Sequence, residues 1–188
     1  VPIDVEPDPR VTGVHAGDSG HNPIDFVRVQ TPAGEALAIY SSVRALSAHR
    51  PGDRPMALDF RTIGLTALIE TGGRVVVNPG TDAVLLPRPA VAALAQGDQW
   101  LPAWRDVALR DLLFDEANAV CSAITDLSIT YAGGGLTRVI VSVERSCFTG
   151  AANASAMKQS LTQALSHVGA NRRLIASADR VEIAPILV

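Results

Sequence analysis

The sequence predicts an α+β fold made of two small mixed α/β subdomains. Short apolar strands alternate with segments of helical period, turns rich in Gly and Pro separate them, and one stretch without any period divides the chain. With 188 residues, of which 47% are hydrophobic, the chain is long enough to bury a core in each half. We expect an irregular arm over 1–24, a first subdomain over 25–97, a linker over 98–105 and a second subdomain over 106–188.

The arm mixes Pro, Gly and Asp and has few periodic apolar positions, which is typical of irregular structure. Its "GDSG" at 17–20 resembles the nucleophile loop of chymotrypsin-like proteases, but His21-Asn22 follow it where that motif has glycine and proline, so we interpret it as a chance match. His15, Asp18 and His21 are spaced by three, but the glycines between them disfavour the helix that would gather them around a metal. We interpret the arm as solvated.

The first subdomain opens with a hairpin over 25–41, since "DFVRVQT" and "EALAIYSS" are strand-like and flank the turn "PAGE". Ser42 can cap a short helix that ends at His49, before Arg-Pro-Gly. "PMALDF" (55–60) is expected as a strand, and Thr62 as the N-cap of a helix over 63–70.

A buried strand follows at 74–77, and "AVLL" at 83–86 returns after the turn between them. Pro89 at a helix N1 position and Gly97 just past the end delimit the last helix of this subdomain.

The second subdomain has an α-β-β-α-β order, which predicts helices on one face of a mainly antiparallel sheet. Its first helix carries apolar residues at helical spacing at Leu109, Leu113, Ala117, Val120 and Ile124. The hairpin "TDLSITYA"–"GGG"–"LTRVIVSVE", an amphipathic helix over 153–169 and a closing strand over 180–188 complete it.

Composition and charge limit the classes of partner that we expect for the chain. The net charge of −3, with no basic stripe in any region, disfavours nucleic acid, and no apolar run reaches the length of a membrane helix. Two cysteines, Cys121 and Cys147, are too few for a disulfide scaffold, so we expect reduced thiols and a cytoplasmic protein. We find no motif for a catalytic set, a cofactor or a metal, and a protein partner is the remaining expectation.

The order "LAIYSSVRAL", "MALDF", amphipathic helix, "VVVNPG" and "VLLPRPAVAAL" resembles the N-terminal domain of the SseB family over about residues 25–97. Residues 105–188 resemble the SseB C-terminal domain more loosely. The Arg- and Ala-rich composition indicates a bacterium of high GC content. The family name is attached both to enhanced serine sensitivity and to type III secretion. The resemblance therefore implies no reaction and leaves the oligomeric state open.

The candidate binding residues are Tyr40 and Ser41, at the end of one strand, and Asn78, Pro79 and Gly80, after another. We interpret the Asn-Pro-Gly triplet first as a tight turn, in which Asn bonds to its own backbone, Pro fixes φ and Gly accepts positive φ. A binding loop is the alternative.

For the whole chain, we predict a non-catalytic protein-binding or adaptor module. The alternatives are a small-molecule-sensing domain linked to amino-acid physiology and an enzyme with a non-standard site that uses Cys147 or the polar groups near Tyr40.

Overall fold

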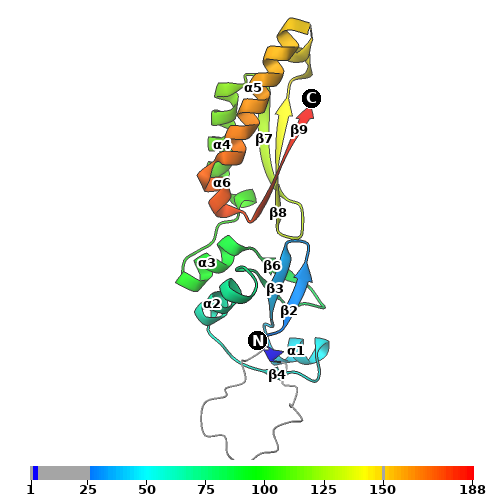
Figure 1. The fold of residues 1–188 in the computed structure, drawn as a ribbon, viewed down its shortest axis with the longest axis vertical. Helices are drawn as coiled ribbons and strands as arrows, with labels where there is room; N and C mark the ends of the chain where they lie inside the picture. The colour runs from blue at the N-terminus through cyan, green and yellow to red at the C-terminus, as the bar shows by residue number, and fades with distance from the viewer. Residues whose placement is uncertain (1, 4–25, 150) are drawn as a thin grey trace, which may run out of the picture. The chain divides into compact units, whose positions relative to one another are not determined.

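The computed structural model describes residues 2–3, 26–149 and 151–188 and divides into two compact units, Val1–Leu86 and Pro87–Val188 (Figure 1). Of the expected arm, only Pro2–Ile3 belongs to the described part, and it forms a strand instead of irregular chain. The "GDSG" stretch and the group His15, Asp18 and His21 lie outside the described residues.

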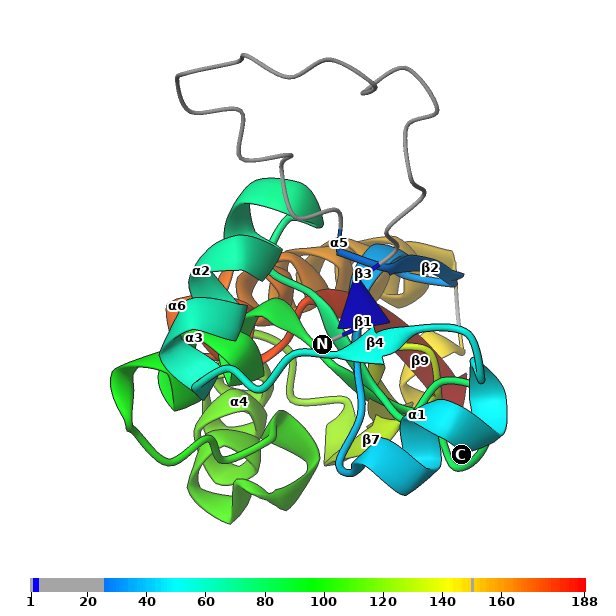
Figure 2. The same ribbon diagram turned by 90° about the horizontal axis from the view of Figure 1, so that it is seen from below.

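In its described residues, the N-terminal unit contains two helices and six strands, and the strands pair in two sheets. Its elements are β1 (Pro2–Ile3), β2 (Arg28–Thr31), β3 (Gly34–Ile39), α1 (Val43–His49), β4 (Arg54–Pro55), α2 (Phe60–Glu70), β5 (Val75–Val77) and β6 (Val84–Leu86). The order β2-β3-β5-β6 forms the larger sheet, and β1 pairs antiparallel with β4 (Figure 2).

The larger sheet is mixed. β2 and β3 form the antiparallel hairpin that the sequence predicts, and β5 and β6 are also antiparallel. β3 and β5, however, run parallel in adjacent positions, and the connection between them carries α1, β4 and α2. Leu37 and Val75 pair at the centre of this sheet and are both fully buried.

Two local predictions are wrong in this unit. "PMALDF" is not a strand: only Arg54–Pro55 pairs, and Phe60 already belongs to α2. The N-cap of α2 is Asp59 and not Thr62, because the Asp59 carboxylate accepts the Thr62 backbone N–H at 2.9 Å and its hydroxyl at 2.8 Å. An Asp satisfies the free amides of a first turn better than Thr, so the helix begins three residues earlier than expected.

The C-terminal unit has the expected element order, with an additional short helix before its last strand. Its elements are α3 (Arg88–Gln96), η1 (Ala103–Arg105), α4 (Val107–Val120), β7 (Ile124–Tyr131), β8 (Leu136–Val143), η2 (Arg145–Phe148), α5 (Ala151–Ala170), α6 (Arg172–Ser177) and β9 (Arg180–Leu187).

Helices α4, α5 and α6 cover one face of the sheet β7-β8-β9, as Figure 1 shows. The sheet is mixed and not mainly antiparallel, because β8 pairs antiparallel with β7 and parallel with β9. The core lies between the helices and the sheet. Its fully buried side chains include Leu109, Leu113, Leu127, Val139, Val141 and Leu174.

The helix boundaries differ slightly from the prediction. α4 ends at Val120, so that Cys121 is its C-cap and Ile124 opens β7 instead of continuing the helix. α3 begins one residue before Pro89, and Gly97 ends it in the left-handed conformation, as expected.

The compact units divide before α3, whereas the sequence places the boundary after it. In the described part of the chain, no helix has the length and apolar character needed to cross a bilayer.

Candidate functional site

The candidate binding residues lie at one end of the N-terminal sheet. Tyr40 and Ser41 directly follow β3, and the triplet 78–80 directly follows β5. Because these two strands are parallel neighbours, their carboxyl ends meet at the same edge of the sheet. Ligands commonly bind at such edges in α/β proteins.

Asn78 links the two strand ends. Its side-chain oxygen accepts the backbone N–H of Ser41 at 2.9 Å, and its amide nitrogen donates to the Ser41 hydroxyl at 3.0 Å. The expectation that Asn78 bonds to its own backbone is therefore wrong: the side chain holds the neighbouring strand end. Asn78 is also the non-glycine residue with positive φ, 53°, among the described residues, a conformation that Asn tolerates better than most.

Gly80 approaches the ring of His49. Its φ of 93° confirms the predicted positive value, and a Cβ built there would lie 2.6 Å from His49 Nε2. The other ring nitrogen, Nδ1, lies 2.7 Å from the Tyr40 hydroxyl. Gly80 is thus required twice, by its backbone conformation and by the imidazole that lies against it.

Tyr40 is half-buried, and partial burial raises the pKa of its hydroxyl above the ordinary value. The guanidinium of Arg50 lowers this pKa and the carboxylate of Asp53 raises it, and these two side chains form an ion pair with each other. The Tyr40 hydroxyl is therefore protonated at neutral pH, and it is a hydrogen-bonding group there and not a base.

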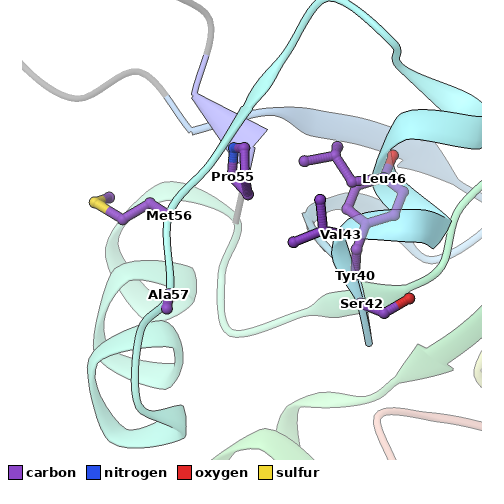
Figure 3. A pocket seen from close by; sticks show the side chains of 7 residues that line it. All are labelled: Tyr40, Ser42, Val43, Leu46, Pro55, Met56 and Ala57. Carbon is purple, nitrogen blue, oxygen red and sulfur yellow. The ribbon is translucent and has the colours of Figure 1, made fainter.

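A shallow hollow of about 190 Å³ lies beside Tyr40 (Figure 3). One wall comes from the end of β3 and from α1, the other from the extended segment that begins in β4. The lining side chains are Tyr40, Ser42, Val43, Leu46, Pro55, Met56 and Ala57. Apart from one hydroxyl each on Tyr40 and Ser42, the side-chain lining is apolar, which suits an apolar side chain better than a charged metabolite.

Of the five candidate residues, only Tyr40 lines this hollow. Ser41 and Asn78 bond to each other, and Pro79 is buried. The structure thus gathers the candidate residues at one corner, where the contacts it gives them are internal to the unit.

A second exposed feature of the N-terminal unit is the outer face of α2. Its inner face buries Ile63, Gly64 and Ala67. On the opposite side Leu65, Leu68 and Ile69 are 55%, 63% and 82% exposed. Residues at this i, i+3, i+4 spacing share one helix face, so the three side chains form a continuous apolar strip, called the α2 strip below.

Sequence reasoning missed His49, the segment after β4 and the α2 strip. A signal for the strip was available, because "IGLTALIE" has apolar residues on both sides of the helix and no fully polar face. No local signal identifies His49, because its role depends on Gly80, which is distant in the sequence.

The cysteines belong to the C-terminal core. Cys121 is buried and Cys147 is half-buried; both are free, and the Cys121 thiol lies 3.7 Å from the Met157 sulfur. This thiol packs as an apolar group. In the parts of the chain that the structure describes, no three His, Cys, Asp or Glu side chains gather in a way that could hold a metal ion.

Comparison with known proteins gives one match. The family model of the SseB protein N-terminal domain matches residues 1–93, a range that contains the α2 strip, the hollow and the Asn-Pro-Gly corner. No curated protein and no solved structure matches the chain. Through this domain, the chain belongs to the SseB family.

Proposed function

We propose that this chain is a non-catalytic protein-binding module of the SseB family, and that the α2 strip is its main docking surface. The α2 strip is the observation that carries the proposal. Complete burial of a Leu or Ile side chain contributes about 1.5–3 kcal/mol, and the three side chains of the strip retain most of that surface in contact with water.

The chemistry of the strip favours an amphipathic helix as the partner. Leu65, Leu68 and Ile69 repeat along one helix face, which is the pattern that helix-to-helix docking uses. Arg61 lies one turn before Leu65 on the same face, is exposed and forms no ion pair within the described residues. A partner helix with an acidic residue at one end of its apolar face would match this arrangement.

The alternatives have less support from the geometry. The hollow beside Tyr40 has a volume of about 190 Å³, below the roughly 300–1,000 Å³ typical of small-molecule sites. The polar groups of the corner, Ser41 and Asn78, bond to each other, which favours a structural role over binding of a metabolite.

Site-specific photocrosslinking tests the proposal. A photoreactive phenylalanine at position 68, in extract of the source organism, should crosslink to a defined helix of a partner, and the same group at position 47 on α1 should not. Leu65→Asp and Ile69→Asp should abolish the crosslink while the melting temperature stays within a few degrees, because both side chains are exposed. Equal crosslinking from both positions, or none from position 68, would contradict the proposal.

A further inference from the structure

The extended segment after β4 has backbone groups that the fold leaves unpaired. Within the described residues, the N–H and C=O groups of Ala57 and Leu58 have no hydrogen-bond partner, although they lie between a strand and a helix. Unpaired backbone beside a strand is the feature to which an extended peptide adds.

The strand just before this segment, β4, already pairs with another extended segment. Arg54 and Pro55 pair antiparallel with Pro2–Ile3, and Ala57 follows two residues after Pro55. A further extended segment that pairs with Ala57 and Leu58 would continue this ladder in the same direction along the chain.

The hollow adjoins this segment. Pro55, Met56 and Ala57 form one wall, and Val43, which is 59% exposed, belongs to the other (Figure 3). A volume of about 190 Å³ suits one apolar side chain of the size of Leu or Met. In peptide recognition by strand addition, main-chain hydrogen bonds supply affinity and a side-chain pocket supplies specificity, and both are adjacent here.

Two exposed arginines adjoin the lining of the hollow, and the carboxylate of Asp59, next to Leu58, accepts hydrogen bonds from Thr62. Arg44 follows the lining residue Val43, and Arg54 precedes the lining residue Pro55; both are exposed, and neither forms an ion pair within the described part of the chain. The nearby Arg50 and Asp53 neutralise each other. A ligand with carboxylates on either side of its apolar residue complements this charge.

We infer that the hollow and the segment 57–58 bind an extended peptide segment of a partner protein that carries one apolar side chain flanked by acidic residues. The inference rests on the proposed protein-binding function and adds to it a second surface, which recognises an extended segment, whereas the α2 strip recognises a helix.

A titration of the ¹⁵N-labelled full chain with the peptide acetyl-DELDE-amide tests the inference. Saturable shifts are expected at the amides of Val43, Ala57 and Leu58. The peptide acetyl-DENDE-amide, in which Asn replaces Leu, should bind at least about ten-fold more weakly, because the apolar side chain is then lost. Raising the salt concentration should weaken binding several-fold, since both arginines are exposed.

Two variants and a control locate the site. Val43→Asp should reduce affinity at least about ten-fold, and Ser47→Asp, an exposed position on the same helix that does not line the hollow, should change it less than two-fold. Arg54→Glu reverses a charge without changing the side chains that line the hollow, and it should weaken binding of the acidic peptide.

Absence of shifts at the hollow at millimolar peptide, or shifts that Val43→Asp and Arg54→Glu leave unchanged, would overturn the inference. Peptide-induced shifts confined to Leu65, Leu68 and Ile69 would also overturn it, while the protein-binding function would remain supported. If position 68 gives no crosslink while the peptide still shifts the amides at the hollow, the peptide site is supported and the α2 strip is contradicted as the main docking surface.

Discussion

Asn78 has two roles in the corner: it adopts a positive φ, and its side chain bonds to the neighbouring strand end. Its φ of 53° places the chain in the left-handed region, and its side chain holds Ser41 of the neighbouring strand end. A residue there must tolerate positive φ and must also reach across to an amide. Asn satisfies both requirements, and Gly satisfies only the first.

Replacement of Asn78 should therefore separate the two roles. Asn78→Gly removes the hydrogen bonds to Ser41 and should cost about 1 kcal/mol. Asn78→Ala also forces Ala into positive φ and should cost about 1–2 kcal/mol more. Chemical denaturation of both variants measures the difference, and equal stability of the Gly and Ala variants would contradict a strained turn at this position.

Asp59 is expected to contribute to the acid sensitivity of the N-terminal unit. The backbone N–H and the hydroxyl of Thr62 donate to its carboxylate and lower its pKa below the ordinary value. A carboxyl whose pKa is lower in the folded state stabilises the fold above its ordinary pKa of about 4, and this contribution is lost as the pH falls through the folded value.

We expect Asp59→Ser, which keeps a capping oxygen without a titrating group, to flatten the dependence of stability on pH below about pH 4. Asp82→Asn is the control, because Asp82 is an exposed acid that caps no helix. Denaturation of both variants across pH 2–6 checks the prediction. An unchanged slope for Asp59→Ser would show that the acid sensitivity originates elsewhere.

At the scale of elements, both edges of the C-terminal sheet are protected. At the β7 edge, Arg110 and Asn118 of α4 donate side-chain hydrogen bonds to the carbonyl groups of Leu127 and Ile124, at 3.2 and 2.7 Å. These contacts occupy acceptors that another strand would use.

The β9 edge is protected by a proline. Val188 donates its N–H to the Val143 carbonyl and accepts the Arg145 N–H, so the backbone groups of even-numbered residues in β9 point toward β8. Those of odd-numbered residues point to the free edge, where Pro185 has no N–H to offer. An edge proline interrupts the row of donors on which a second strand would align.

Pro185→Val should therefore promote self-association, because it restores a donor at the centre of this edge and adds a β-branched side chain. Ala184→Val is the matched control, since the N–H of residue 184 points toward β8. Sedimentation velocity should show concentration-dependent dimers for the first variant only. Identical behaviour of the two variants would mean that Pro185 does not protect the edge.

The sequence predicts elements better than their pairing. The hairpin of β2 and β3, the Ser42 cap and the Gly97 helix end were all predicted, because each depends on residues close together in the chain. The parallel pairs β3·β5 and β8·β9 depend on strands that a long connection separates, and no local pattern specifies them. The candidate site follows the same rule: its turn was predicted, and its contact with His49 was not.

At the scale of the whole molecule, the C-terminal unit carries its own core. Every side chain of the buried cluster, from Ala103 to Leu174, belongs to Pro87–Val188. Asp106 caps α4 and also accepts two hydrogen bonds from Arg173 of α6, at 2.9 and 2.7 Å, which ties the start of α4 to α6. A unit with a closed core and such internal ties is expected to fold alone.

The two possible boundaries between the units differ in where they place α3. The structure assigns α3 to the C-terminal unit, and the sequence predicts it in the N-terminal subdomain. Arg88 of α3 donates to Asp179 at 2.7 Å, and the Asp179 carboxylate is only 1% exposed. We predict that the fragments 87–188 and 98–188 both fold and that the longer one is more stable by about 1–3 kcal/mol, since it keeps a charge-assisted hydrogen bond to a buried group. Arg88→Ala in the longer fragment should remove most of this difference in urea denaturation. Equal stability of the two fragments would support the later boundary, and an unfolded longer fragment would show that the C-terminal unit requires residues 1–86.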